Sequence, residues 1–362
     1  MASILSVATA VPPERVAQAH AKALAGEHFR GKISNLGKYL TVFDHSLVDE
    51  RAFCLRPEAL LAVSGLGAAN RLYVEWAERL GTEAARSCLA RAGADPAAVD
   101  GIVFVSSTGI ATPSLDVGLI ESLGLRPDVR RVPVFGLGCG GGAAGLAIAG
   151  RLADAGPAFT HRGSGASTSR ASASVLLVAV ELNSLTFQRG DYSKSNLVAS
   201  SLFADGAAAA LVTGGDGPVE IVESATYLVP GSRGLMGWDF LDSGFRVVFS
   251  RRIPKVIQDM IPETLGRLLD PRGLDPRSLA SLVLHPGGRK ILEAYETALG
   301  VSRECLDASY RVLARYGNMS SATVLFVLDE EMRVPERAPG DLGLLAAFGP
   351  GFSAEASLLR WA

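Results

Sequence analysis

The 362-residue sequence has few of the residues that mark several common classes of protein. It contains only four cysteines, far apart in the chain, and five histidines, and neither type shows the close spacing of metal ligands. The spacing therefore predicts no metal site, and unpaired cysteines suit a reducing cytoplasm. Charge of neither sign dominates, because 35 basic and 37 acidic residues give a net charge of −2. This balance excludes a surface built for nucleic acid or for membranes.

Long hydrophobic runs are also missing. No apolar run reaches the roughly 18 residues that a spanning helix needs, and the apolar start at residues 3–11 has no basic segment before it. We read this start as a first strand and not as a signal peptide, and we expect a cytoplasmic protein. Hydrophobic residues nevertheless make up 48% of the chain, which is enough for one large core or two joined cores.

A glycine-rich segment at 132–149 surrounds one of the cysteines. It reads as a short buried strand, a turn and a helix of small and apolar residues, with Cys139 where the helix would begin. The positive end of the helix dipole and the unpaired backbone N–H groups favour a thiolate there. A lone cysteine in an apolar segment is as often a small core residue. This segment alone leaves both interpretations open.

The same segment matches the fingerprint of dinucleotide-binding proteins. Gly136-x-Gly138-x-x-Gly141 follows a strand and precedes a helix. Such a site needs an acidic residue roughly 20 positions further on. Asp154 falls inside the helix, and Glu181 lies about twice that distance away. An NAD-dependent oxidoreductase therefore stays as an alternative.

The second half of the chain repeats landmarks of the first, roughly 180 residues apart. An Asp-Pro turn before a buried strand occurs at 95–96 and again at 275–276, and Asn318 falls where Cys139 fell. We predict an internal duplication in which each half is a mixed sheet covered by helices, with the active groups where the halves meet. The two predicted units are residues 1–215 and residues 216–362.

Two polar residues of the second half stand at positions that the repeat makes apolar. His285 takes the place of Val105 at the end of a buried strand, and Asn318 heads a buried helix. Buried polar groups cost roughly 1–3 kcal/mol each unless they are paired, so we expect both to share one site with Cys139. An imidazolium would lower the pKa of the thiol for attack on a thioester. The imidazole and amide N–H groups could then hold the enolate formed when a malonyl thioester loses carbon dioxide.

These motifs resemble the type III polyketide synthases, the group that includes chalcone synthase. The resemblance rests on the order Cys, His, Asn, on His-Pro-Gly-Gly at 285–288 and on Tyr-Gly-Asn-Met-Ser-Ser at 316–321. Leu-Phe-Ala-Asp-Gly at 202–206 and Phe-Gly-Pro-Gly-Phe at 348–352 extend it over essentially the whole chain. It implies a thiolase-like α/β fold, with two duplicated αβαβα halves in five layers, and a homodimer. It also implies malonyl-CoA and an acyl-CoA starter as substrates, with no metal or redox cofactor.

The resemblance also assigns roles to residues. Cys139 would carry the acyl group, while His285 and Asn318 would drive decarboxylation, and Phe203 would be the aromatic gate between a CoA tunnel and an elongation cavity. Thr112 would lie near the dimer interface. The other implied substrate-binding residues are Arg51, Ser107, Thr108, Glu181, Asn183, Thr186, Gly237, Val247, Gly287 and Ser320.

Departures from the plant enzymes bear on the starter. A second gatekeeping phenylalanine corresponds to Val247, Asn183 and Leu185 replace smaller or different groups, and the serine-rich segment 156–173 resembles an insertion. A smaller gate residue widens the cavity, so we expect a medium- or long-chain aliphatic starter and an alkylpyrone or alkylresorcinol product. Malonyl-CoA alone, as in naphthalene- or phloroglucinol-type synthases, is the alternative. An initiating ketoacyl-carrier-protein synthase, a hydroxymethylglutaryl-CoA synthase and an inactive scaffold dimer fit less well.

Overall fold

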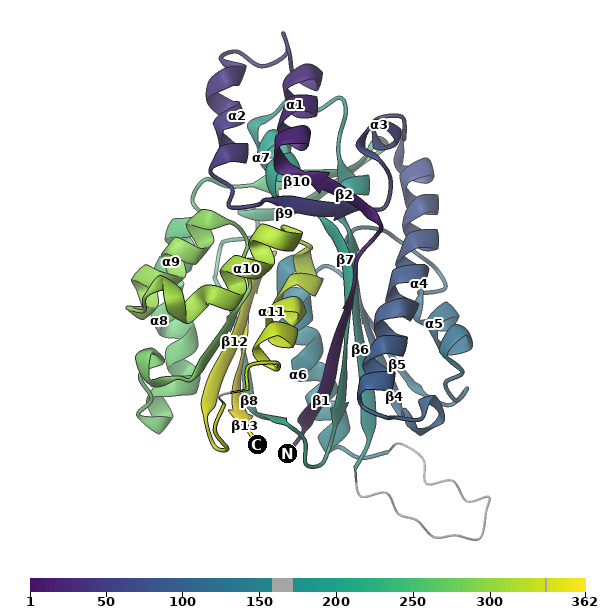
Figure 1. The fold of residues 1–362 in the computed structure, drawn as a ribbon, viewed down its shortest axis with the longest axis vertical. Helices are drawn as coiled ribbons and strands as arrows, with labels where there is room; N and C mark the ends of the chain where they lie inside the picture. Colours follow the sequence, from purple (N-terminus) through teal and green to yellow (C-terminus); the bar gives the residue numbers. More distant parts are fainter. Residues whose placement is uncertain (158–171, 336) are drawn as a thin grey trace.

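The computed structural model describes residues 1–157, 172–335 and 337–362. These residues form a body of five layers in which helices alternate with the two halves of a sheet (Figure 1). The central layer holds α6 (Gly141–Asp154) and α11 (Thr323–Glu331), and each of these helices contacts strands of both halves. The predicted thiolase-like architecture is confirmed.

The two halves of the chain build their parts of the sheet with the same topology. In each half a parallel pairing is followed by two antiparallel ones, and the first half has β5 as an additional parallel strand at its outer edge. The strands β1 and β8 join the halves at Ser3–Glu220 and Ile4–Val219. The described residues give the order β11 (Ser281–Leu284), β12 (Leu342–Gly349), β13 (Ser353–Trp361), β8 (Val219–Leu228), β1 (Ser3–Ala10), β7 (Asp205–Thr213), β6 (Ser174–Leu182), β4 (Gly101–Val105), β5 (Arg130–Val134).

A matching turn opens the equivalent strand of each half. The carboxylates of Asp95 and Asp275 each accept a hydrogen bond of 2.9 Å from the backbone N–H two residues on. These bonds start the 3₁₀ turns η1 (Pro96–Ala98) and η5 (Pro276–Ser278) before β4 and β11. Proline suits the first position of such a turn because its missing N–H would have no partner there. The repeated Asp-Pro pair therefore reflects the duplication.

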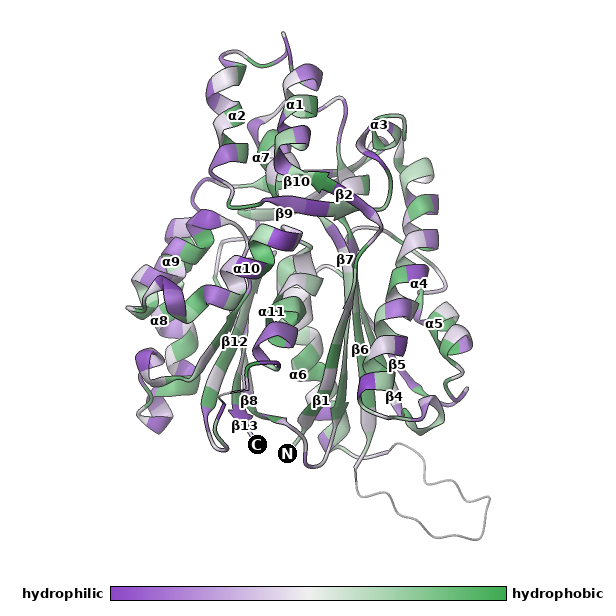
Figure 2. Ribbon diagram, in the orientation of Figure 1, coloured by the Kyte–Doolittle hydropathy of each residue, from purple (hydrophilic) through white to green (hydrophobic). Residues whose placement is uncertain are grey.

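Three hydrophobic clusters fill the spaces between the layers. One lies under α4 (Leu66–Arg91) and α5 (Asp116–Leu123), one surrounds α6 and α11, and one lies under α8 (Ile253–Leu269) and α9 (Arg289–Leu299). Figure 2 shows apolar residues concentrated in the strands and hydrophilic ones on the outer helices. Strands buried on both faces read as nearly continuous apolar runs, as β6 and β7 do.

A smaller unit covers one end of this body, at the top of Figure 1. It contains the helices α1 (Gln18–His28), α2 (Leu36–Asp44), α3 (Pro57–Leu60) and α7 (Lys194–Leu202). It also contains two antiparallel two-stranded sheets, one of β2 (Glu14–Ala17) and β3 (Glu50–Phe53) and one of β9 (Met236–Leu241) and β10 (Gly244–Phe249). The end of α7 reaches the head of α11, because Phe203 and Asn318 pair as an isolated parallel bridge. This unit therefore borders the place where Cys139 and Asn318 stand.

Two further features concern the predicted boundaries. The expected division at 215/216 falls in the connection between β7, which ends at Thr213, and β8, which begins at Val219. The segment 156–173 lies mostly outside the described residues, which omit 158–171. Among the helices that the structure describes, none combines the length and apolar character that a membrane crossing requires.

Candidate active site

The duplication brings Cys139 and Asn318 together at the heads of the two central helices. Cys139 lies in the 3₁₀ turn η2 (Gly138–Gly140), directly before α6, and Asn318 precedes the turn η7 (Ser320–Ala322) before α11. The Cys139 Sγ lies 4.0 Å from the Asn318 Oδ1 and 3.6 Å from the Ser320 Oγ. The Ser320 N–H donates a 2.8 Å hydrogen bond to the Asn318 Oδ1, which fixes the amide orientation. The amide nitrogen of Asn318 donates to the carbonyl of Gly287 at 3.4 Å.

His285 follows β11 and joins this group through Gly287 and Asn318. Its side chain is 3% exposed, and neither ring nitrogen has a hydrogen-bond partner among the described residues. Its main chain is held by the N–H bond to Ala346 (2.9 Å) and by the Tyr295 hydroxyl, which donates to the His285 carbonyl at 3.3 Å. Buried polar atoms without partners cost free energy. The imidazole is thus held by its backbone, with its ring nitrogens free for a bound ligand.

Burial of Cys139 and His285 acts against the expected charged pair. Burial raises the pKa of Cys139 to about 11, and the charge of Glu181 acts in the same direction. Burial also lowers the pKa of His285 to about 3. No hydrogen bond links the two side chains among the described residues, so the desolvation of both charged forms outweighs the helix dipole. Both pKa shifts favour a neutral thiol and a neutral imidazole in the unliganded site.

Glu181 connects the turn η7, through Ser321, with the loop of Ser107 and Thr108 that contacts the turn of Cys139. Its carboxylate accepts hydrogen bonds from the Ser107 N–H (3.0 Å), the Thr108 hydroxyl (2.8 Å) and the Ser321 hydroxyl (2.6 Å). The Ser107 hydroxyl in turn accepts from the Gly138 N–H at 3.1 Å. Burial raises the pKa of Glu181 to about 7 despite these donors. The Ser107 N–H and the Thr108 hydroxyl are thus bound to Glu181, while the Ser107 hydroxyl holds the turn of Cys139.

Two of the three glycines of the apparent dinucleotide fingerprint, Gly138 and Gly141, serve close packing. A Cβ on Gly138 would lie 2.7 Å from Pro350, and one on Gly141 would lie 2.6 Å from Val105. The motifs at 202–206 and 316–321 also meet closely, because a Cβ on Gly206 would lie 2.5 Å from the sulfur of Met319. The oxidoreductase interpretation is therefore unnecessary to explain these residues.

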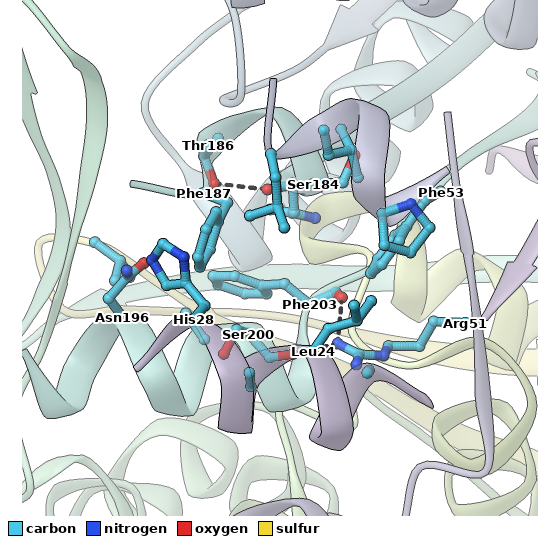
Figure 3. A pocket seen from close by; sticks show the side chains of 18 of the residues that line it. Leu24, His28, Arg51, Phe53, Ser184, Thr186, Phe187, Asn196, Ser200 and Phe203 are labelled. Atoms are coloured by element: carbon cyan, nitrogen blue, oxygen red, sulfur yellow. Dashed lines mark hydrogen bonds between the residues drawn. The ribbon is translucent and has the colours of Figure 1, made fainter. Parts of the chain in front are cut away.

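Phe203, Val247, Asn183 and Thr186 line a separate pocket between α1 and α7 (Figure 3). Its cavity volume is about 110 Å³, and the pocket is partly open to solvent. Most of its wall is apolar, including Ala21, Leu24, Ala25, Phe29, Phe53, Leu60, Leu61, Phe187 and Ala199. Phe203 joins this pocket to the catalytic group through its bridge with Asn318.

The aromatic wall near the gate has more members than the sequence indicated. Phe203 and Val247 pack with Trp238 and Phe249, whose ring centroids lie 6.0 Å and 5.6 Å from that of Phe203. Gly237 lies on β9 opposite Val248, and a Cβ there would meet nothing within 4 Å. Val247 is thus a small side chain among aromatic neighbours in this wall.

Arg51 and Thr112 are not members of the catalytic group, although Arg51 packs on Gly317 next to Asn318. Arg51 lines the pocket but is fully buried, and its two terminal nitrogens donate to Ser200, Phe203 and Gln18. Thr112 is exposed and lines a hollow with Phe135 and Phe240 on another face. The expectation that Arg51 binds substrate directly has no support in this geometry, because its terminal groups are already occupied.

Sequence reasoning missed two parts of the site. Ser321 completes the bonds to Glu181, and the pair of adjacent serines in the motif at 316–321 was the available signal. The wall contributed by α1 was also missed, since residues 14–26 showed only an alanine-rich helical pattern. Within residues 1–157, 172–335 and 337–362, no group of three or more His, Cys, Asp or Glu side chains could hold a metal ion.

Comparison with known proteins identifies the family. Residues 1–218 match the N-terminal domain of chalcone and stilbene synthases, and residues 220–362 match the C-terminal domain. The chain is 36% identical over 375 residues to a putative chalcone synthase of Bacillus subtilis (strain 168), covering 100% of this chain and 99% of the relative. It is 40% identical over 365 residues to the 1,3,6,8-tetrahydroxynaphthalene synthase of Streptomyces peucetius subsp. caesius, covering 99% and 93%.

Solved structures agree with this. The 1,3,6,8-tetrahydroxynaphthalene synthase of Streptomyces coelicolor A3(2), a bacterial type III polyketide synthase, superposes with a TM-score of 0.91 at 29% identity over 99% of both chains. The C-terminal type III polyketide synthase domain of Steely1 from Dictyostelium gives a TM-score of 0.89 at 28% identity over 99% of both chains. With both family domains matched along the chain, and a cysteine and an asparagine facing each other at the heads of its central helices, this protein belongs to the chalcone and stilbene synthase family and is a type III polyketide synthase, an enzyme of the acyltransferase class.

Proposed function

We propose that the enzyme loads an acyl-CoA starter onto Cys139 and extends it with malonyl-CoA. The observation that carries this proposal is the convergence of Cys139, Asn318 and Ser320, with Asn318 bonded to the Gly287 that follows His285. The buried imidazole of His285 has no hydrogen-bond partner for its two nitrogens among the described residues. A thiol nucleophile and neutral N–H donors in a desolvated site suit acyl transfer and enolate stabilisation.

In the loading step, the Cys139 sulfur attacks the thioester carbonyl of the starter. The thiol proton passes to His285, and from there to the departing CoA thiolate. The acyl group is then bound to Cys139 and free CoA leaves. This route begins from a neutral thiol and imidazole, the forms that the pKa shifts of both groups favour.

In the extension step, malonyl-CoA loses carbon dioxide and becomes an enolate. An imidazole N–H of His285 and the amide N–H of Asn318 would hold the enolate oxygen. The enolate carbon attacks the acyl group on Cys139, the C–S bond breaks, and the cysteine sulfur regains a proton. The product is a β-ketoacyl-CoA that is two carbons longer, which returns for another round or cyclises.

We propose a medium- or long-chain aliphatic starter, extended two or three times to an alkylpyrone or alkylresorcinol. The support is the apolar pocket at Phe203 and Val247, which a flexible hydrocarbon chain would fill with little polar cost. A synthase that uses malonyl-CoA alone is the second candidate. It is favoured by the 40% identity to a tetrahydroxynaphthalene synthase.

We also propose where the CoA phosphates bind. Lys194, at the start of α7, lies with its Nζ 4.4 Å from the ring centroid of Tyr39 on α2. Lys194, Arg251 and Lys38 together lower the pKa of the Tyr39 hydroxyl, with the hydrogen bond from Lys194 as the largest cause. Three cations beside the unit that walls the pocket suit an anionic cosubstrate. Lys194→Glu should raise KM for malonyl-CoA with little change in kcat.

A homodimer is the proposed assembly. β5 is an edge strand with no partner on its outer side among the described residues. Beside it, Phe135 is 54% exposed, Phe240 53% and Ile110 45%, around the hollow that Thr112 lines. A second copy of the chain would cover this apolar face. Phe135→Glu combined with Phe240→Glu should shift the protein toward monomer in light scattering, whereas an unchanged mass would reject this face.

The proposed reaction uses no metal or redox cofactor, only the two CoA thioesters. Activity should therefore survive dialysis against EDTA, and loss of activity that a metal restores would overturn this point. The free cysteines and the CoA substrates also suit a cytoplasmic enzyme, which cell fractionation would test.

The decisive experiment incubates the protein with labelled malonyl-CoA and a panel of C6 to C20 acyl-CoA starters, beside malonyl-CoA alone. Cys139→Ala serves as the matched inactive variant, and mass spectrometry reads the products. Pyrones or resorcinols that carry the starter chain and vanish in the variant would support the main proposal. A naphthalene- or phloroglucinol-type product from malonyl-CoA alone would select the second candidate. No product under any condition would reject both.

A further inference from the structure

The last turn of α7 ends in a set of backbone carbonyls that all have partners from distant parts of the chain. The final carbonyls of a helix have no partner within it and carry partial negative charge. Here Arg51 Nη1 donates to the carbonyls of Ser200 (2.8 Å) and Phe203 (3.0 Å), and Gln18 donates to that of Ser201 (2.8 Å). The remaining carbonyl, that of Leu202, accepts the backbone N–H of Asn318 at 2.8 Å.

Arg51 therefore touches both segments that carry functional side chains. Its guanidinium holds the backbone of Phe203, and Ala204 donates its own N–H to the Asn318 carbonyl at 2.9 Å. The methylene stem of Arg51 packs on Gly317, where a Cβ would lie 2.8 Å from the Arg51 Cγ and 2.9 Å from the Leu202 carbonyl oxygen. Gly317 also has a positive φ of 70°, so the residue before Asn318 fits the arginine stem only as glycine.

The arginine is itself held in place. It is fully buried, which is unusual for a cation, and its Nη2 donates to the Gln18 Oε1 at 2.9 Å. Gln18 is fixed by the Ser46 hydroxyl at 2.7 Å. The buried Asp205 compensates the charge from a distance, while its oxygens bind the Cys54 N–H and the Ser184 N–H at 2.8 Å each. A guanidinium fits two carbonyls and an amide oxygen because its donors form a rigid planar fork.

We propose that Arg51, oriented by Gln18, is a positioning residue that holds Phe203 and Asn318 in register with Cys139. It does not touch the reacting atoms. It sets where the Asn318 amide stands, and a displacement of about 1 Å at such a group costs on the order of 100-fold in rate. This inference rests on the proposed roles of Asn318 and Phe203, but the packing that it describes can be measured without them.

The test compares Arg51→Met and Arg51→Lys with Arg15→Met. Arg15 is the matched control because it lies on β2, beside Arg51 on β3, and also approaches the segment before Asn318, at the Arg315 carbonyl (3.5 Å). Its side chain is 41% exposed, so its removal should change little. Hydrogen exchange followed by mass spectrometry is the first readout, on peptides covering 200–206 and 316–320.

We expect Arg51→Met to speed exchange at least tenfold in both peptides, through the N–H groups of Ala204 and Asn318, and to leave the peptide covering 138–150 unchanged. Arg51→Lys keeps the charge but not the planar guanidinium fork, so its exchange rates should fall between those of Arg51→Met and wild type. Equal exchange in Arg51→Met and Arg15→Met would overturn the proposal. So would faster exchange throughout the chain, which would make Arg51 a general stabiliser.

Kinetics give the second readout. Arg51→Met should lower kcat for extension about 10- to 100-fold while KM for malonyl-CoA changes less than about threefold and the alkylation rate of Cys139 stays within about twofold. An equal loss in kcat and alkylation would contradict a positioning role. If wild type makes no polyketide at all, the proposed function fails, while the exchange measurement still decides the role of Arg51.

Discussion

Gly142 of α6 and Ser321 of η7 touch across the junction of the two halves, and a Cβ on Gly142 would lie 2.1 Å from the Ser321 carbonyl oxygen. Backbone atoms cannot give way at such a contact as the end of a flexible side chain can. The spacing between α6 and α11 therefore depends on residue 142 being a glycine, without a Cβ. The approach of Cys139 to Asn318 depends on this spacing in turn.

Gly142→Ala should force these helices apart. We expect a loss of about 2 kcal/mol in the free energy of unfolding, as for overpacked cores, and a fall in kcat of at least tenfold. Urea unfolding and steady-state kinetics measure the two effects. Gly37→Ala is the control, because α2 leaves open space at that position, and it should be neutral or slightly stabilising. If both variants behaved alike, the contact would not matter.

The acidity of Cys139 is open to direct measurement. Since burial raises its pKa to about 11, the rate of alkylation by iodoacetamide should keep rising, close to tenfold per unit, from pH 7 to pH 9. The exposed Cys305 would also react, so the measurement belongs in a Cys305→Ser background. A plateau with an apparent pKa below 7 would show instead that a thiolate–imidazolium pair forms in the free enzyme.

The buried His285 should make the wild type sensitive to acid. Its pKa is about 6.5 in the unfolded chain and about 3 in the folded protein, so below pH 6.5 only the unfolded state takes up the proton. Stability is therefore lost as the pH falls through 6.5 toward 3. Compared with His285→Gln, the wild type should lose about 1 kcal/mol between pH 7.5 and pH 5.5.

Urea unfolding of both proteins at the two pH values measures this difference. The buried Glu181 and Asp205 titrate in the same range, with pKa values raised by burial to about 7 and about 6. Both residues are present in both proteins, so their effects cancel in the comparison. A difference that did not change with pH would mean that His285 binds its proton equally well in the folded state.

The pocket between α1 and α7 should set the length of the starter. Ala21→Phe places a ring into this pocket from α1, so the preferred acyl-CoA should become shorter, with kcat/KM for long chains falling at least tenfold and that for C6 nearly unchanged. Ala23→Phe, on the exposed side of the same helix, is the control. Competition between C6 and C16 acyl-CoAs, read by mass spectrometry, gives the ratio. An equal ratio in both variants would place the chain elsewhere.

Much of this molecule was predictable because duplication leaves a record in the sequence. The Asp-Pro turns at 95 and 275 and the matched positions of Cys139 and Asn318 indicated two equivalent halves before any coordinates, and the thiolase-like fold follows from them. His285 could be singled out for the same reason, since its equivalent in the other half is apolar. Repeats reveal function where one copy breaks the pattern.

Other features depend on contacts between distant segments, which spacing does not encode. Arg51 looked like a surface or substrate-binding residue, but its partners are backbone carbonyls near residue 200, and carbonyls leave no mark in a sequence. The thiol was expected to be acidic from its place at a helix head. Burial acts against that expectation, because desolvation depends on the whole surrounding packing, including Glu181, and not on the local helix.

The first strand has a consequence for synthesis in the cell. β1 pairs with β7 and β8, and the ribosome makes both of them long after it. At a synthesis rate of 5–20 residues per second, β1 remains without its first strand partner, β7, for on the order of 10–40 s. Throughout that interval the nascent chain exposes an unpaired apolar strand that can aggregate. The yield in a heterologous host should therefore depend on chaperone supply and on slow translation after β7 more than on the stability of the finished enzyme.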